Sequence, residues 1–583
     1  MTYRAPVEAI RLSLETAGGL GEDMAAGRTG ELTPDMLGNV LAEAARFAET
    51  ELAPQNAPGD RIGARFENGR VVLPPGWPTL YRAWREGGWN GVDLPAAWGG
   101  MGLPTRLAAA TTEIFTSACM AFSLLPVLNQ GATDAIEAHA DEALKARYLP
   151  KLVSGEWTAT MNLTEPQAGS DLGLIATRAT PQEDGTFRLA GAKIFITYGA
   201  HDLAENIVHL VLARIDGAPE GTRGLSLFLV PQRIPDASGA PGPENDVICT
   251  GIEHKLGIHA SPTCTMRFGE RDGAVGWLVG EANRGLAGMF TMMNKARLFT
   301  GLQGIAVAER ALQLARAFAA TRRQGRAPGG AGPEPDAIIA HPDVRRMLMT
   351  MRALTAAGRA LAHDAARAID HARLDPDQAE RAGLLTPLVK AYGAEIGCEV
   401  ASLAIQVHGG MGYVEETGAA QLFRDARITP IYEGTNGIQA IDLVLRKVLR
   451  PGSTLAETWI GACAAHGRAA AAAGLGATGA ILGEAADALG AATRWLRAEA
   501  GRPEHLLGAA TPYLALFARV AALDALTRVA VAARRRQEGG ADAPHLAAAI
   551  ADARFYAENV AVMAPGLARI VCAAQVDPVE TLL

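Results

Sequence analysis

The sequence predicts an α+β chain with a helical N-terminal domain, a central antiparallel β domain, a helical-bundle C-terminal domain and an extra C-terminal helical domain. Helical spacing of apolar residues dominates both ends, while short β-branched and aromatic runs fill a central segment. The 583 residues, 49% hydrophobic and 20% charged, provide enough chain for several globular cores. We expect the four domains to cover residues 1–157, 158–280, 281–450 and 451–583.

The first domain opens with a helix signal at Thr33-Pro34-Asp35, where a capping hydroxyl precedes a proline at the first helical position. Apolar residues then follow at helical spacing, so we expect a helix over residues 33–50. Helical patterns continue to about residue 157, with breaks at the turn-rich residues 60–77 and 98–102. This pattern predicts an all-helical first domain.

The central domain is predicted from short runs of β-branched and aromatic residues, each bounded by Gly, Pro, Asp or Asn. Such runs are typical of strands in a compact antiparallel sheet. They are Lys193–Thr197, Ile207–Ile215, Leu225–Val230 and Thr263–Phe268.

Helical periodicity returns after Gly285 and predicts the two C-terminal domains. Its long segments are residues 292–323, 342–372 and 383–407. The break Pro451-Gly452-Ser453-Thr454 then separates an alanine-rich helical stretch, in which Thr511-Pro512 reads as a helix start and Gly539-Gly540 as a stop. No repeat at a fixed period stands out, so a solenoid is not expected.

Charge and composition exclude several functional classes. The net charge of −8 leaves no broad basic face, so no nucleic acid partner is expected. The six cysteines form no CxxC pair and no histidines show metal-ligand spacing, so we expect reduced thiols and no metal site. The N-terminus lacks a signal-peptide core and no run of about 18 purely apolar residues occurs. We therefore expect a cytoplasmic protein and no membrane association.

Four segments are richer in glycine and small polar residues than their surroundings require, which is typical of loops that hold ligands. Residues 162–171, NLTEPQAGSD, offer hydroxyls and open backbone amides suited to phosphate, although ordinary turn chemistry also explains them. Residues 193–199, KIFITYG, would place Phe195 and Thr197 on one face of a strand. That pair suits a planar ring, while the alternative is a plain hairpin strand with one core aromatic residue.

The third segment, residues 406–413 (QVHGGMGY), follows a long helix, so its glycines first of all predict a helix C-cap and His408 a structural histidine. The fourth, residues 428–439 (ITPIYEGTNGIQ), places one carboxylate, Glu433, after an apolar approach. Such a site disfavours the charged form and raises the pKa towards the range useful for removing a proton from carbon. Alternatively, Thr435 or Asn436 caps the next helix and Glu433 only favours its dipole.

Together, and in this order, the four segments resemble the acyl-CoA dehydrogenase family of flavoproteins. LTEPQAGSD resembles its TEP-x-AGSD loop, KIFITYG its K-x-W-I-T-N-G strand, QVHGGMGY its Q-x-x-GG-x-G loop and IYEGTNGIQ its catalytic YEGT segment. The resemblance covers about residues 40–450. The whole chain looks like the larger subgroup that contains 3-methylmercaptopropionyl-CoA dehydrogenases, which residues 252–257 and 290–304 support.

The resemblance implies FAD-dependent α,β-dehydrogenation of an acyl-CoA thioester to a trans-2-enoyl-CoA. It assigns Glu433 as the base that removes the α-proton, and its backbone N–H, with a flavin ribityl hydroxyl, as donor to the developing enolate. Some family members place the base next to the arginine that here is Arg297, but that position is Ala296, which cannot remove a proton. The implied substrate-binding residues are Ser170, Asn294, Arg297 and Gly434.

The resemblance also implies an FAD site with departures from the usual pattern. Phe195 stands where the family usually has Trp, the Arg322–Arg326 segment lacks the usual Phe, and Pro342 follows His341 where Gln is usual. The implied cofactor-binding residues are Leu163, Thr164, Gly169, Ser170, Phe195, Thr197, Arg322, Gln324, Gln406, Gly409, Gly410, Thr435 and Gly437. Five of these residues would reach the FAD of a neighbouring subunit: Arg322, Gln324, Gln406, Gly409 and Gly410.

The implied partners are an acyl-CoA substrate, electron-transfer flavoprotein as electron acceptor, and a second copy of the chain. In extended relatives the extra domain occupies the surface that shorter tetrameric members use to pair dimers, so we expect a homodimer. The subgroup favours 3-methylmercaptopropionyl-CoA or a straight-chain fatty acyl-CoA as substrate. The alternatives are an acyl-CoA oxidase that uses oxygen, and a non-catalytic acyl-CoA-binding protein, which the retained Glu433 argues against.

Overall fold

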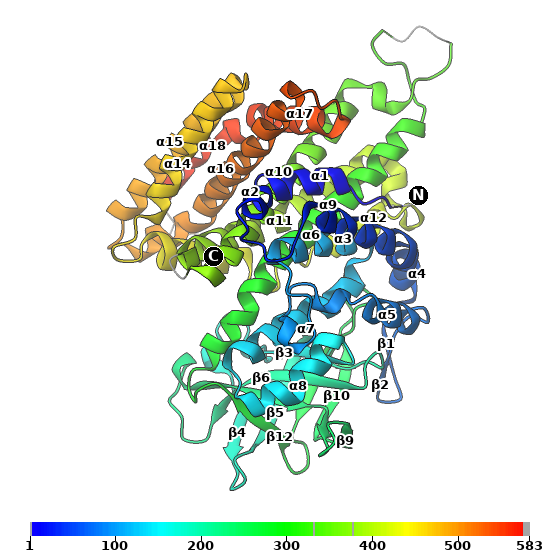
Figure 1. Cartoon of the computed structure of the whole chain (residues 1–583), viewed down its shortest axis with the longest axis vertical. Helices are drawn as coiled ribbons and strands as arrows, with labels where there is room; N and C mark the ends of the chain where they lie inside the picture. The colour runs from blue at the N-terminus through cyan, green and yellow to red at the C-terminus, as the bar shows by residue number, and fades with distance from the viewer. Residues whose placement is uncertain (1–2, 330–332, 376–377, 575–583) are drawn as a thin grey trace, which may run out of the picture. The chain divides into compact units, whose positions relative to one another are not determined.

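The computed structural model describes residues 3–329, 333–375 and 378–574 (Figure 1). Its contacts divide the chain into two compact units. The sheet unit comprises Phe47–Leu103 and Ala118–Ala296, and the helical unit comprises Met1–Arg46, Pro104–Ser117 and Arg297–Leu583. The α+β class with an extra C-terminal helical region is confirmed.

The sheet unit is built on an eight-stranded sheet in the order β10-β11-β5-β12-β7-β6-β3, with β4 pairing β5 and β6. The pairing is antiparallel, as predicted, except that β3 and β4 run parallel to β6. The strands are β3 (Trp157–Asn162), β4 (Arg178–Pro181), β5 (Phe187–Thr197), β6 (Asn206–Ile215), β7 (Leu225–Pro231), β10 (Val247–Ile252), β11 (Thr263–Phe268) and β12 (Ala274–Val279).

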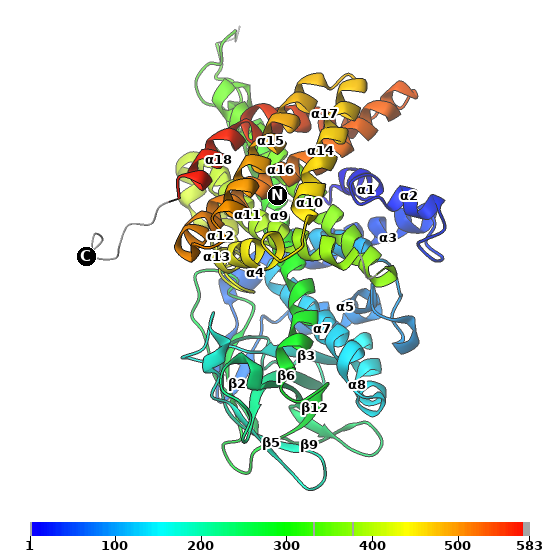
Figure 2. The same ribbon diagram turned by 90° about the vertical axis from the view of Figure 1, so that its left-hand side faces the viewer.

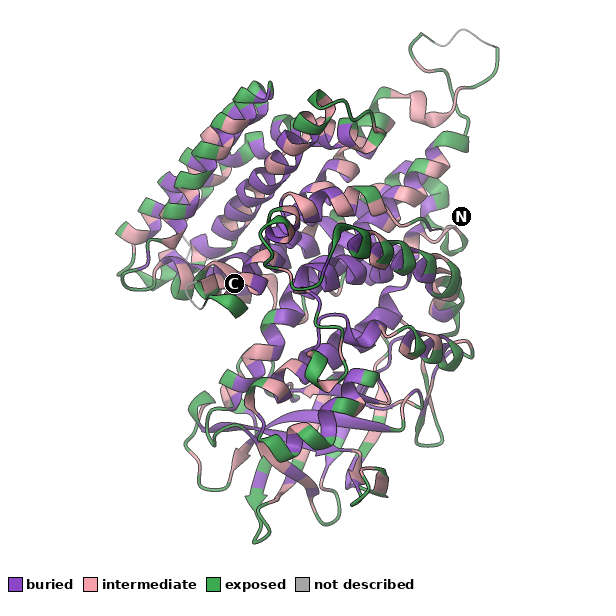
Figure 3. Ribbon diagram, viewed as in Figure 1, coloured by how far each residue is buried: buried purple, intermediate pink, exposed green. Residues whose placement is uncertain are grey.

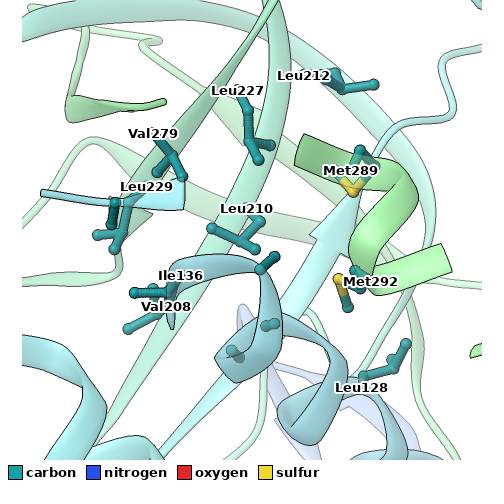
Figure 4. Close-up of a cluster of buried hydrophobic side chains, with 14 of the residues drawn as sticks. Leu128, Ile136, Val208, Leu210, Leu212, Leu227, Leu229, Val279, Met289 and Met292 are labelled. Carbon is teal, nitrogen blue, oxygen red and sulfur yellow. The ribbon is translucent and has the colours of Figure 1, made fainter. Parts of the chain in front are cut away.

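Helices cover this sheet through a continuous apolar core. Figure 4 shows Ile136 of α7 beside Val208 and Leu210 of β6 and Leu229 of β7, and Leu128 of α7 beside Met292 of α9. The helices of this unit include α4 (Ala53–Ile62), α5 (Trp77–Glu86), α7 (Met120–His139), α8 (Glu142–Ser154) and the first residues of α9 (Gly285–Thr321).

A short hairpin, β1 (Arg65–Glu67) and β2 (Arg70–Val72), lies within the segment that the sequence marked only as a break in helical periodicity. The expectation of an all-helical first domain is therefore wrong at these residues. The reason is local, because Asn68 and Gly69 both adopt positive φ, 52° and 77°, and form the two-residue turn that joins two antiparallel strands.

The helical unit is a bundle, and its helix α3 (Pro34–Phe47) begins where the sequence signal predicts. The Thr33 hydroxyl accepts a hydrogen bond from the Met36 N–H at 3.2 Å and so caps α3. Its other helices before residue 450 include α1 (Val7–Glu15), α6 (Thr105–Ala118), α10 (Pro342–Leu374), α11 (Ala379–His408), α12 (Ala419–Ala426) and α13 (Asn436–Ile441).

Glycines let α9 and α11 cross at backbone contact inside this bundle. A Cβ atom on Gly304 would lie 2.0 Å from the carbonyl oxygen of Gly393, and one on Gly393 would lie 2.1 Å from that of Gly301. No side chain fits at either distance, so the crossing needs glycine. Arg297 lies one turn before Gly301 on α9, and Lys390 lies just before Gly393 on α11.

The C-terminal helices belong to the same compact unit, and α16 and α17 lie beside α10 in both views (Figures 1 and 2). Buried Asp364 of α10 pairs with Arg528 of α16 at 3.0 Å, and the Tyr392 hydroxyl of α11 donates to the Tyr556 hydroxyl of α17 at 2.9 Å. These helices are α14 (Leu455–Ala472), α15 (Gly476–Ala498), α16 (Pro503–Glu538), α17 (Pro544–Asn559) and α18 (Ala564–Cys572).

The long helix α16 differs from its sequence prediction at its start. It begins at Pro503 and runs through Pro512, so Thr511-Pro512 does not start a helix, while its end at Glu538, before Gly539-Gly540, is as predicted. Burial of the flanking residues offsets the backbone bond that Pro512 removes (Figure 3). Among the described residues, α16 is the one helix long and apolar enough to cross a membrane, but 67% of its apolar window is buried within the protein.

Candidate active site

The predicted base, Glu433, lies in the short loop between α12 and α13. The Asn436 N–H donates to the Pro430 carbonyl at 3.0 Å and closes this loop, and Thr435 caps α13 by accepting a hydrogen bond from the Ile438 N–H at 3.2 Å. The capping role considered for Thr435 is thus confirmed. Glu433 itself has φ 58°, in the left-handed region that a side chain with a Cβ disfavours. Such backbone strain concentrates at functional sites.

The Glu433 carboxylate is placed to bind and release a proton near neutral pH. Its Oε2 atom is buried and has no hydrogen-bond partner within the described part of the chain. Burial raises the pKa of Glu433 to about 7, and nearby Arg297 and Lys390 limit the rise because they favour the anion. A carboxylate with this pKa is suited to general-base catalysis.

The backbone of the same loop leaves the Glu433 N–H available as a donor. The Gln439 side chain donates to the carbonyl oxygens of Glu433 at 3.4 Å and of Gly434 at 3.3 Å. A Cβ atom on Gly434 would lie 2.8 Å from that amide nitrogen, and Gly434 has φ 83°, so only glycine suits this position. Over residues 3–329, 333–375 and 378–574, no oxygen accepts a hydrogen bond from the Glu433 N–H.

Arg297 brings a buried guanidinium to Glu433 from α9, and burial lowers its pKa while Asp442 and Glu433 act to raise it. The position before it, Ala296, is 3% exposed and carries no titratable group, so the only predicted base is Glu433. The other predicted substrate residues on the surface, Asn294 and Ser170, are exposed and belong to the sheet unit.

A buried ion pair joins the first two predicted segments of the sheet unit. Lys193 Nζ lies 2.8 Å from Glu165 Oε1 and also donates to the Leu163 carbonyl at 2.9 Å, and both charged side chains are at most 3% exposed. Burial would raise the pKa of Glu165, but Lys193 and the Thr177 hydroxyl hold it below its usual value. This pair fixes the backbone at Leu163 and Thr164 against strand β5, where the Ile194 N–H donates to the Thr164 carbonyl at 2.9 Å.

Strand β5 contains a bulge at the predicted aromatic residue. Its register with β11 shifts between Lys193 and Ile196, and Phe195 has φ 60°. The bulge reverses the alternation of faces: Lys193 is buried, whereas Phe195 is 58% exposed and Thr197 is half-buried. A largely exposed phenyl ring on β5, and the open backbone of Gly169 on the preceding loop, where a Cβ would meet no atom within 4 Å, fit a planar cofactor with a phosphate tail.

The remaining predicted cofactor residues lie in the helical unit, and most of them lie on its surface. The Arg322 guanidinium donates to the Gln324 amide oxygen at 3.4 Å in a turn after α9. Gln406 lies in the last turn of α11, and Gly409 caps this helix with φ 59°, as predicted. The exposed members are Arg322, Gln324, Gln406, Gly409, Gly410 and Gly437, while Thr435 is half-buried.

His408 is structural, as predicted. Its Nδ1 atom lies 2.7 Å from the Ala404 carbonyl oxygen, and its ring stacks on Phe318 with centroids 4.4 Å apart. Burial lowers its pKa, so the imidazole is neutral at physiological pH.

Sequence reasoning missed the residues that support these loops. Glu165, Lys193 and Gln439 stand inside the quoted segments, yet nothing in their spacing predicts ion pairing or carbonyl binding. Lys390 had a signal, because it is a single charged residue within the apolar run 384–394, and such a charge requires a buried partner.

Four consecutive stretches of the chain match known domain families. Residues 38–156 match the acyl-CoA dehydrogenase N-terminal domain, residues 160–270 its middle domain and residues 283–449 its C-terminal domain. Residues 458–580 match the family described as acetyl-CoA dehydrogenase C-terminal like.

Individual proteins are similar over most or all of the chain. The 3-methylmercaptopropionyl-CoA dehydrogenase of Ruegeria pomeroyi is 47% identical over 570 residues, 96% of each chain. A butyryl-CoA dehydrogenase of Syntrophomonas wolfei is 37% identical over 70% of this chain and 69% of its own. The structure of a Bacillus anthracis acyl-CoA dehydrogenase complexed with FAD superimposes with a TM-score of 0.73 at 22% identity, covering 95% of this chain and 91% of that one.

Proposed function

The chain belongs to the acyl-CoA dehydrogenase family, and we propose that Glu433 is the base with which this FAD-dependent enzyme removes the α-proton of an acyl-CoA thioester. The observation that carries the proposal is the Glu433 carboxylate itself. It is buried at Oε2, lies beside two cations, has a pKa of about 7 and is held on strained backbone.

The residues of the chain divide the chemical tasks among them. Glu433 Oε2 accepts the α-proton, and the Glu433 N–H donates to the thioester oxygen on which enolate charge develops. The chemistry that bound FAD would supply is acceptance of a hydride from the β-carbon, which would give a trans-2-enoyl-CoA. Phe195, Thr197 and the Leu163–Ser170 loop of the sheet unit would hold the cofactor.

We infer that the substrate is 3-methylmercaptopropionyl-CoA. The relative of that name is similar over nearly the whole of both chains, including the extra domain, whereas the butyryl-CoA dehydrogenase is similar over about two thirds of its length. A straight short-chain acyl-CoA is the second candidate. The inferred electron acceptor is electron-transfer flavoprotein, and the inferred compartment is the cytoplasm.

Anaerobic titration of the purified holoenzyme tests the reaction and the base together. We expect 3-methylmercaptopropionyl-CoA to bleach the flavin absorbance of the wild type more rapidly than butyryl-CoA does. The Glu433→Gln variant should keep FAD but lose about 10³-fold or more in reduction rate, because a carboxamide cannot accept the proton.

Two results would contradict these assignments. Reduction of the Glu433→Gln variant near the wild-type rate would refute Glu433 as the base. Rapid reoxidation of the wild-type flavin by oxygen with release of peroxide would refute the dehydrogenase assignment in favour of an oxidase.

A further inference from the structure

Lys390 is a buried cation that the proposed chemistry does not yet use. It lies on α11, where its side chain is 0% exposed among apolar neighbours such as Leu388, Val389 and Ala391. Its ammonium donates to the Asn436 side-chain oxygen at 3.0 Å. Burying an ammonium group is costly unless its charge is compensated, and a single neutral amide compensates it poorly.

The compensation comes from the charged groups around the catalytic loop. Burial lowers the pKa of Lys390, whereas Glu433 acts to raise it, Arg297 acts to lower it, and Glu395 on the next turn of α11 acts to raise it. Around Glu433, the cations are Arg297 from α9 and Lys390 from α11. Asp442 and Arg446 act on Arg297, and Asp425 acts with Glu433 on Tyr432.

Asn436 links this cation to the backbone that carries Glu433. Its Nδ2 atom donates to the Ala391 carbonyl and to Glu395 Oε1, both at 3.4 Å, and its N–H closes the loop onto Pro430. Lys390 therefore meets the loop at its C-terminal end, while its charge acts on the carboxylate three residues earlier. The glycine crossing of α9 and α11 places both cations at this loop.

We propose that Lys390 is a positioning residue that holds the Glu433 loop through Asn436 and stabilises the ionised carboxylate that removes the α-proton. This inference rests on the proposed role of Glu433. It assigns two separable effects, because the hydrogen bond to Asn436 fixes the loop geometry, whereas the positive charge sets the pH at which the base is active. A lysine with only a structural role would affect stability and rate but not that pH.

The test compares Lys390→Met, Lys390→Arg and Asn436→Ala by the second-order rate constant of anaerobic flavin reduction as a function of pH. Removing the charge should move the midpoint of the profile upward by about one pH unit, because the anion of Glu433 loses a nearby cation. Lys390→Arg keeps the charge and should keep the wild-type midpoint. Asn436→Ala keeps the charge of Lys390 and removes the side-chain hydrogen bonds of Asn436, so it should lower the rate without moving the midpoint.

An unshifted midpoint in Lys390→Met would overturn the proposal. If that variant does not yield holoenzyme, Lys390→Gln, which keeps a donor for Asn436, replaces it and must show the same upward shift. If neither neutral variant yields holoenzyme while Lys390→Arg does, that result would also count against the proposal, because the positive charge would then be required for folding. Glu433→Gln is measured in parallel to distinguish failure of the proposed function from failure of this inference. An active Glu433→Gln refutes the proposed function. An inactive Glu433→Gln together with an unshifted midpoint in Lys390→Met refutes only this inference.

Discussion

Glu433 combines burial with two nearby cations, and the balance places its pKa close to neutrality. The carboxylate must be ionised to accept a proton. Flavin reduction at low substrate concentration should therefore rise with pH, reach half its maximum near pH 7 and level off above the pKa. Below it, the rate should fall about tenfold for each pH unit, because the ionised fraction does so.

Stopped-flow reduction at a series of pH values between about 5.5 and 9 measures this profile. As a control, the FAD content of the enzyme must stay constant over this pH range, so that loss of cofactor is not mistaken for titration of Glu433. A rate that does not change between pH 6 and 9 would mean that Glu433 is ionised throughout and that burial does not raise its pKa.

At this scale the sequence predicted the base and the sense of its pKa shift, because an isolated carboxylate after an apolar run is visible in the chain. It could not predict the left-handed backbone of Glu433 or its partner Lys390. Lys390 lies 43 residues before Glu433, and the packing of α13 against α11 brings the two together.

At the scale of the elements, the contact between α9 and α11 depends on glycine. We expect Gly304→Ala to lower the free energy of unfolding by about 2 kcal/mol, because its Cβ would lie 2.0 Å from the Gly393 carbonyl oxygen and the helices must separate. The cations Arg297 and Lys390 would move with them, so flavin reduction should slow as well.

Thermal unfolding of the holoenzyme measures this effect, with Gly461→Ala as the control. Gly461 lies on the exposed side of α14, where a Cβ would meet no atom within 4 Å. Alanine there should stabilise the helix by about 0.5–1 kcal/mol. Equal midpoints for the two variants would show that the crossing tolerates a methyl group.

Strand β5 shows why element prediction stops short of the site. Strict alternation would place Lys193, Phe195 and Thr197 on one face, whereas the bulge buries Lys193 and leaves Phe195 exposed. A bulge depends on the register with β11, some 70 residues later, and leaves no local signal. Pro512 is the opposite case, a strong local signal that tertiary packing of α16 overrides.

At the scale of the whole molecule, we predict a homodimer in solution. The residues expected to reach a neighbouring subunit's FAD are exposed, and the loop after α11 also exposes three apolar side chains, Met411 (49%), Tyr413 (87%) and Val414 (39%). A cluster of exposed apolar residues on one short loop is typical of an interface.

Size-exclusion chromatography with light scattering should give the mass of two chains. Tyr413→Glu should shift the protein towards monomer and reduce its FAD content, because a charge would be buried at the interface. Ile570→Glu, at a 56% exposed apolar position on α18, is the control and should leave both unchanged. A wild-type holoprotein that runs as a monomer at micromolar concentration would contradict the prediction.

The order of helical and β segments along the chain was readable from periodicity, and the family matches follow the same order. The packing of the C-terminal helices could not be predicted from periodicity. Pairs such as Asp364 with Arg528 and Tyr392 with Tyr556 join residues about 160 positions apart, and neither has a sequence signature. The extra helices therefore belong to the same compact unit as α10 and α11.

The left-handed backbone at Glu433 also bears on how this gene can change. Glycine would relieve the strain at that position, and a single-base change of a glutamate codon reaches glycine. A library selected for thermostability alone would therefore enrich glycine at 433, and one selected for growth on the substrate would remove it. Selection for turnover would retain glutamate at position 433, although glycine there would favour folding. If that selection were lost, we expect substitutions of Glu433 to accumulate before substitutions that disrupt the fold.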